Sequence, residues 1–212
     1  SRSRPLASQT TRNFYQEVNE GGKDQYTIMS FPGQTLFGST GLTSGLDRGQ
    51  HQMDSILYRV AGTKLYTIDS SGTHADLGTI PGTERCIFAD DGVNLFIVTE
   101  LKVYHYDGAT IARVLDTEID GAKSVAFLNN QFLYTKDRFT TVSDVGNGAS
   151  ASGLNIVGAE SDPDILIRDY VFQQNIYRMG ARSTEIWYNS GVGSPPIARI
   201  EGEIFQIGLG AI

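Results

Sequence analysis

Short segments in which apolar and polar positions alternate recur along most of this chain. Residues 57–60 (LYRV) are followed 38 residues later by 95–98 (LFIV), and after another 38 residues by 133–135 (LYT). A less regular fourth copy begins at 176–178 (IYR). Alternation of this kind is typical of β-strands with one buried face, and a period between about 20 and 50 residues indicates a repeat architecture.

Each copy continues with three more segments that read as strands. Turn residues separate them, with Gly at positions that need a positive φ and Asp or Asn beside it, as in β-hairpins. The predicted strands of the first two copies are 57–60, 64–68, 76–80 and 86–89, then 95–98, 102–106, 110–114 and 124–128. Those of the last two are 133–135, 139–142, 154–157 and 165–167, then 176–178, 185–188, 197–200 and 204–207.

Four strands in roughly 38–43 residues, with no helix between them, predict an all-β fold: a β-propeller, or a propeller portion, built of four-stranded blades. The last and most apolar segment of each copy is expected to close its blade as the innermost strand. Residues 25–50 are a candidate for another blade. Residues 1–24 are polar and predict an N-terminal arm, which leaves 25–212 for the blades of an incomplete fragment. The alternative fold is a β-sandwich of irregular repeats.

Composition narrows the classes of function. Lys and Arg number 17 against 24 Asp and Glu, so the formal net charge is −7, and we expect neither a protein that works by coating nucleic acid nor sequence-specific nucleic-acid binding. The single Cys86 lies in an apolar run and is expected to be a buried thiol without a disulfide. No stretch approaches the roughly 18 consecutive apolar residues of a membrane-spanning helix, so no membrane partner is expected.

Candidate chemistry is sparse. The histidines His51, His74 and His105 stand in no Ser-His-Asp frame, and His74 with Asp76 lacks the further ligands of a metal site. Three carboxylate pairs that a glycoside hydrolase could use read first as turn or strand residues: Asp90 with Asp91, Asp162 with Asp164, and Glu201 with Glu203. Gly191 and Gly193 indicate a hairpin connection, and the basic residues are scattered. We therefore assign no catalytic, cofactor-binding or metal-binding residue.

Several motifs, in order along the chain, resemble one family: the packaged-DNA stabilization proteins, or tail accessory factors, of short-tailed bacteriophages. The motifs are 11–19 (TRNFYQEVN), 30–33 (SFPG), 56–66 (ILYRVAGTKLY), 159–164 (AESDPD), 168–170 (RDY) and 183–188 (STEIWY). Gln16 departs from the pattern, because proline is common there. Family members are roughly twice as long, so the chain resembles their N-terminal half.

The resemblance implies a structural virion protein of the tail, made in the host cytoplasm and without enzymatic activity or cofactors. It implies a hub or plug that retains packaged DNA between the portal–adaptor ring and the tail needle, with tailspikes around it, and a ring homo-oligomer in the assembled tail. The residues alone leave two alternatives open: a propeller that binds a glycan or peptide, and a propeller hydrolase.

Overall fold

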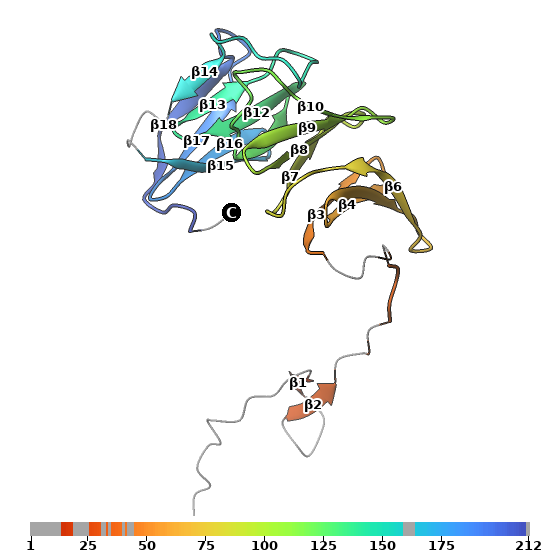
Figure 1. Cartoon of the computed structure of the whole chain (residues 1–212). Coiled ribbons are helices and arrows are strands. Elements are labelled where there is room, and N and C mark those ends of the chain that lie inside the picture. The colour runs from red at the N-terminus through yellow and green to blue at the C-terminus, as the bar shows by residue number, and fades with distance from the viewer. Residues whose placement is uncertain are drawn as a thin grey trace, which may run out of the picture. The chain divides into compact units, whose positions relative to one another are not determined.

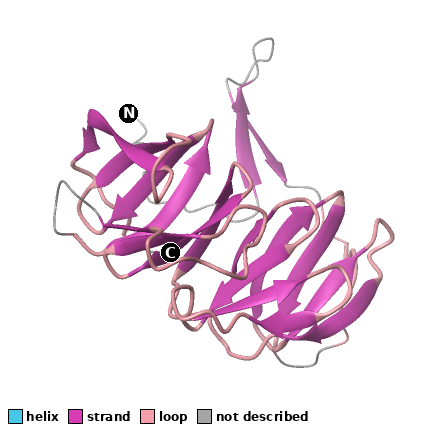
Figure 2. Cartoon of the chain, turned by 90° about the horizontal axis from the view of Figure 1, so that it is seen from above, coloured by secondary structure: helices cyan, strands magenta, loops and turns pink. Residues whose placement is uncertain are grey.

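The computed structural model describes residues 14–18, 26–30, 33, 35–39, 41, 45–158 and 164–210. The chain divides into two compact units, Ser1–Phe37 and Gly38–Ile212. In the first unit, β1 (Phe14–Val18) and β2 (Tyr26–Ser30) form an antiparallel pair. The described residues contain strands, turns and loops (Figure 2), and among them no helix is long and apolar enough to cross a membrane.

The second unit contains four four-stranded antiparallel sheets, which confirms the predicted blades (Figure 1). The first two sheets comprise β3 (Asp47–Met53), β4 (Ile56–Ala61), β5 (Lys64–Ile68) and β6 (His74–Thr79), then β7 (Ile87–Asp90), β8 (Leu95–Thr99), β9 (Lys102–Tyr106) and β10 (Ile111–Arg113). The last two comprise β11 (Ser124–Leu128), β12 (Gln131–Lys136), β13 (Phe139–Val142) and β14 (Ile156–Gly158), then β15 (Leu166–Phe172), β16 (Asn175–Gly180), β17 (Thr184–Asn189) and β18 (Ile197–Phe205).

The grouping of strands into blades differs from the prediction by one strand. The apolar segments at 86–89, 124–128 and 165–167 open the next sheet as β7, β11 and β15, and do not close the preceding one. The first sheet takes its first strand, β3, from the region expected to form another blade, where β2 instead pairs with β1. Segments 197–200 and 204–207, predicted as two strands, lie in or at the end of the single strand β18.

Tight turns explain this difference in three of the four sheets. In the first, third and fourth sheets, the first and second strands are joined by two-residue turns of positive φ at Asp54-Ser55 (46° and 63°), at 129–130 (Asn-Asn) and at Gln173-Gln174 (48° and 67°). The usual sequence signal for such a turn contains glycine, because glycine adopts positive φ without steric cost. These turns lack it, so the hairpins that they close were not recognised.

The repeat alignment was also wrong by one residue in the third copy. The turns at 62–63, 100–101 and 137–138 lie between paired strand ends and place Phe132, not Leu133, in register with Leu57 and Leu95. The cause is burial on both faces: Phe132, Leu133 and Tyr134 are each at most 2% exposed. A strand without a polar face carries no alternation that would fix its register.

The four first strands adjoin one another in the order β3, β7, β11, β15. Apolar side chains fill the space between successive sheets in three clusters. Leu65 and Ile97 contribute to the cluster between the first and second sheets, Phe96 and Phe132 to the next, and Trp187 to the last. This burial of apolar area is the main term that holds the sheets together.

A buried arginine also joins the first two sheets. Arg48, on β3, is only 3% exposed. Its guanidinium donates to the carbonyl oxygens of Glu84 (2.7 Å), Ile80 (2.8 Å), Gly62 (3.1 Å) and Pro81 (3.1 Å), and to the Thr99 hydroxyl (2.7 Å). These bonds satisfy the donors of a side chain that would otherwise be costly to bury.

A buried ion pair within the fourth sheet, between Asp169 of β15 and Arg178 of β16, is hydrogen-bonded to the third sheet. Arg178 Nε lies 3.5 Å from Asp169 Oδ1, and neither side chain is exposed. The Thr135 hydroxyl donates to Asp169 Oδ2 at 3.0 Å, and the Thr140 hydroxyl donates to the same oxygen. The guanidinium of Arg178 also donates to the Gly158 carbonyl (2.8 Å) and lies 4.6 Å from the centre of the Trp187 ring.

Candidate functional site

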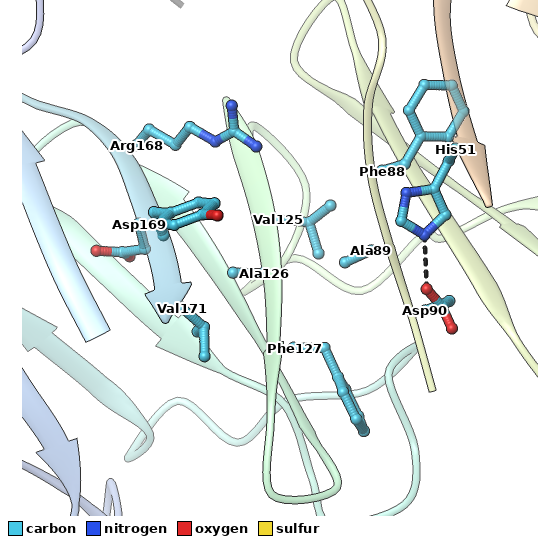
Figure 3. A pocket seen from close by; sticks show the side chains of 11 residues that line it. His51, Phe88, Ala89, Asp90, Val125, Ala126, Phe127, Arg168, Asp169 and Val171 are labelled. Carbon is cyan, nitrogen blue, oxygen red and sulfur yellow. Dashed lines mark hydrogen bonds and ion pairs between the residues drawn. The ribbon is translucent and has the colours of Figure 1, made fainter. Parts of the chain in front are cut away.

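A cavity of about 280 Å³ lies along the four first strands (Figure 3). Every blade contributes to its lining, through His51 of β3, residues 88–90 of β7, residues 125–127 of β11 and residues 168–171 of β15. We call this space the axial cavity. Since the first strands of a propeller's blades surround its axis, the axial cavity is where residues from all four sheets converge.

One wall of the axial cavity carries a histidine and a carboxylate in contact. His51 Nε2 donates to Asp90 Oδ2 at 2.6 Å, and the imidazole stacks on the Phe88 ring with the ring centres 5.8 Å apart. Both side chains are partly exposed, at 27% for His51 and 23% for Asp90. The carboxylate therefore fixes the tautomer and the orientation of the ring, as second partners of histidines commonly do.

The opposite wall carries Arg168 and Tyr170, both from β15. In Figure 3 the Arg168 guanidinium points into the axial cavity. It lies 5.9 Å from the centre of the Tyr170 ring, and Arg168 Nε is buried without a hydrogen bond to any described residue. Asp169, between them in sequence, turns the other way and pairs with Arg178.

The arrangement has the features of a binding surface and lacks those of a hydrolytic centre. Within the described lining, the His51–Asp90 pair has no serine, cysteine or lysine beside it that it could activate. Sequence analysis missed the pair because its members are 39 residues apart on different blades. Only the order of the first strands brings them together, and the sequence gives no local signal for that order.

The other two histidines have structural roles. His105 stacks on Phe96 with the ring centres 4.6 Å apart, and its Nε2 is 2.9 Å from Asn94 Oδ1. Burial lowers the pKa of His105, against the opposing charges of nearby carboxylates. His74 Nδ1 is 3.1 Å from the Gly72 carbonyl, and its ring meets Tyr66 edge-on. No group of three metal ligands forms among the described residues.

The candidate carboxylates mostly brace turns, as their sequence context predicts. Asp91 accepts from the backbone amides of Val93 (2.9 Å) and Asn94 (2.7 Å), whereas Asp90 combines a turn contact with its bond to His51. Asp164 accepts from the amides of Arg182 and Ser183. Its predicted partner Asp162 lies outside the described residues, as do residues 159–161 of the same motif. Glu201 and Glu203 are exposed on β18.

The remaining predictions about single residues fit the structure. Cys86 is a buried free thiol, and burial raises its pKa. Gly191 and Gly193 lie in the connection between the paired strands β17 and β18. Of the scattered basic residues, Lys64 pairs with Asp76, Lys123 pairs with Asp137 and Arg178 is buried, which argues against a continuous phosphate-binding stripe.

Solved structures with a similar fold come from unrelated settings. The extracellular domain of BT4673, a one-component system of B. thetaiotaomicron, matches with a TM-score of 0.56 at 14% identity, over 81% of this chain and 25% of that one. PorZ, a surface component of the type-IX secretion system of Porphyromonas gingivalis, matches with a TM-score of 0.54 at 12% identity, over 92% of this chain and 31% of that one. At such identities the likeness shows the fold alone.

A search of curated proteins found no match. A family model described as "Bacteriophage P22 Gp10, beta-propeller" matches residues 3–211, nearly the whole chain. The match agrees with the four-stranded blades and with the motifs that resemble phage DNA-stabilization proteins. The chain therefore belongs to the P22 Gp10 β-propeller family, whose members are structural, non-enzymatic proteins of the phage tail that stabilise packaged DNA.

Proposed function

We propose that this chain is part of a tail hub that retains packaged DNA between the portal–adaptor ring and the tail needle, with tailspikes around it and with several copies arranged as a ring. The observation that carries this proposal is the family match over residues 3–211, which coincides with the blades of the second unit. The virion tail is then the site of action, and the host cytoplasm is the site of synthesis and assembly.

The first unit supports a role in assembly. Its two-stranded sheet exposes four large apolar side chains: Phe14 (49%), Tyr15 (41%), Ile28 (63%) and Met29 (41%). A two-stranded sheet is at best marginally stable in water, so contact with another surface would stabilise it. Exposed apolar groups of this kind also mark protein interaction sites.

The charge of the chain supports retention by closure and not by adhesion to DNA. With a net charge of −7, the chain has no overall attraction for phosphates. Arg178 is moreover buried between blades, and Lys64 and Lys123 are paired with carboxylates. A ring of such subunits would block the exit of DNA sterically, and DNA would not adhere to it during ejection.

Capture by the portal–adaptor complex of the same phage tests the proposal. The purified protein is measured by light scattering alone and after addition of that complex, and we expect co-migration in a defined ring stoichiometry. Ile28→Ser should weaken capture, whereas Leu154→Ser, which alters a 77% exposed side chain in a blade loop, should not. A stable monomer that is not captured, and that binds sugars on a glycan array, would contradict the hub and favour a lectin-like propeller.

A further inference from the structure

Arg48, Arg168 and Arg178 each have a guanidinium that is buried at least in part, and Arg168 is unlike the other two. Arg48 donates five hydrogen bonds, and Arg178 donates three and faces Asp169. Arg168 makes no hydrogen bond or ion pair with the described residues, and only the Tyr170 ring accompanies its guanidinium. A guanidinium presents five donors in a rigid fork, so this one is an unused donor set that faces the axial cavity (Figure 3).

The other charges in the axial cavity are already matched. Asp90 accepts a hydrogen bond from His51 at 2.6 Å, and Asp169 is paired with Arg178 and receives two threonine hydroxyls. Among the residues that the structure describes, the lining therefore holds one positive charge that pairs with no carboxylate, that of Arg168. A single negative charge would neutralise it, whereas the second charge of a dianion would have no cation to pair with and would be repelled by the carboxylate of Asp90 in the same lining.

Aromatic side chains line the same cavity as this charge. Tyr170, Phe88 and Phe127 all line the axial cavity, and the Tyr170 side chain is 46% exposed. A volume of about 280 Å³ is at the lower end of ligand pockets, so the axial cavity suits a small group and not a nucleic acid strand. Flat apolar groups pack well on such rings, and the guanidinium fork matches the two oxygens of a carboxylate.

We propose that the axial cavity is a binding site for a carboxylate attached to a flat apolar group, with Arg168 as the bidentate donor and Tyr170 and Phe88 as the packing surface. Two sources supply this chemistry: a free small carboxylate, or an acidic side chain beside an aromatic one in a protein segment. The site goes beyond the hub role and does not depend on it, so either idea can fail while the other stands.

The test is a titration of the protein with sodium benzoate, benzamide and inorganic phosphate at constant ionic strength, followed by two-dimensional ¹H–¹⁵N NMR. Benzoate should cause saturable shifts confined to β3, β7, β11 and β15, and neutral benzamide should not. Arg168→Gln should weaken benzoate binding by about tenfold or more, because the charged bidentate contact is lost. Arg138→Gln, which changes an exposed arginine in the β12–β13 turn, should leave it unaltered.

A blocked tetrapeptide with one glutamate beside a phenylalanine distinguishes the two sources. Binding of this peptide, with loss of binding for its glutamine analogue, assigns the site to a protein segment, whereas binding of benzoate alone assigns it to a free carboxylate. The proposal is overturned if benzoate causes no saturable shifts in these strands, if benzamide or phosphate binds as well as benzoate, or if Arg168→Gln binds benzoate like the unaltered protein.

Discussion

Two neighbouring blade interfaces are built from different chemistry. Between the second and third sheets the contact is aromatic and aliphatic, with Phe96 and Phe132 at a centroid distance of 4.3 Å and Tyr134 fully buried beside them. Between the third and fourth sheets, an apolar cluster is accompanied by the ion pair of Asp169 and Arg178, which lies on the fourth sheet and is hydrogen-bonded to the third. At the first interface, the loss of stability caused by a substitution should depend on how much side-chain volume it adds or removes. The second interface should depend on both charges being present.

The two interfaces therefore contribute differently: one mainly stabilises the contact between sheets, and the other mainly selects which sheets meet. Burial of apolar area stabilises any blade contact of the right shape, so the aromatic interface by itself selects its neighbour only by fit. The ion pair contributes little net energy relative to an apolar replacement. Both charges lie on the fourth sheet, so a wrongly docked blade would keep the pair but lose its hydrogen bonds to Thr135, Thr140 and the Gly158 carbonyl, which leaves buried polar groups unsatisfied. We expect the charged interface to fix which sheets meet and in what register.

The largest effect is expected from Asp169→Leu. The change leaves Arg178 buried and uncompensated, so the free energy of unfolding, measured by urea denaturation, should fall by about 3–5 kcal/mol. The double variant Asp169→Leu/Arg178→Met should recover most of this loss, because an apolar pair no longer needs compensation. A double variant as unstable as the single one would show that the interface depends on shape and not on charge.

An exposed ion pair provides the matched control. Asp47 and Arg59 lie on β3 and β4, and the Asp47 side chain is 63% exposed. Asp47→Leu removes one charge of an ion pair, as Asp169→Leu does, but water can solvate the remaining arginine. Its effect on the free energy of unfolding should be much smaller than that of Asp169→Leu.

The aromatic interface should respond to added volume. A Cβ at Gly148 would lie 2.5 Å from side-chain atoms of both Phe132 and Phe96, which is shorter than a van der Waals contact, so the rings would have to move. Gly148→Ala should therefore lower the free energy of unfolding by about 1–3 kcal/mol through overpacking. Gly153→Ala in the same loop meets only Glu118 at 3.7 Å and should be nearly neutral in thermal or urea denaturation. Equal losses in both variants would contradict the overpacking explanation.

A buried tyrosine hydroxyl at the same interface makes a hydrogen bond whose contribution to stability can be measured. Tyr134 donates to the Gly148 carbonyl at 2.6 Å, and burial raises the pKa of its phenol well above the usual value. Tyr134→Phe should reduce the free energy of unfolding by about 1 kcal/mol, because the buried carbonyl loses its donor. Tyr106→Phe, which removes a partly buried bond to the Gly108 carbonyl, should cost less, since water can take its place. The reverse order would contradict this assignment.

These interfaces also show what the sequence could predict. Similar alternating segments recur 38 residues apart, at Leu57 and Leu95, and this repeat predicted the blades. The segments can be recognised because apolar and polar residues alternate along a strand with one buried face. The division into sheets was wrong because turns such as Gln173-Gln174 adopt positive φ without glycine. Contacts between blades could not be predicted from this alternation. They join residues far apart in sequence, and their geometry exists only once the sheets stack.

The axial cavity could not be predicted from the sequence for the same reason. His51 and Asp90 belong to different blades, and Arg168 stands out in the sequence only as part of the RDY motif at 168–170. A partner for His51 could not be named before the order of the first strands was known. The one usable signal was local: in the RDY motif two opposite charges adjoin, and on a strand adjacent side chains point to opposite faces. One of those two, Asp169, then faces the neighbouring blade, and the other, Arg168, faces the axial cavity.

The smallest predicted effect is a pH dependence that originates at the aromatic interface. His105 stacks on Phe96, and burial lowers its pKa, so the folded protein favours the neutral ring. The unfolded chain, with a histidine pKa near 6.5, binds more protons, and stability should decrease as the pH falls through about 6.5. His105→Phe keeps the stacking and should flatten urea-denaturation stability between about pH 7 and 5.

A carboxylate supplies the control for this window. Hydrogen bonds from the Ser71 hydroxyl and the Thr73 amide lower the pKa of Asp69, which does not interact with His105. Its contribution to stability is present above its unfolded value and is lost only as the pH falls through its lowered pKa, so Asp69→Asn should leave the slope between about pH 7 and 5 unchanged. If the stability of His105→Phe fell with pH as steeply as that of the unaltered protein, the acid sensitivity would arise from another group. The stability of the aromatic interface would then not depend on pH, as expected from its apolar composition alone.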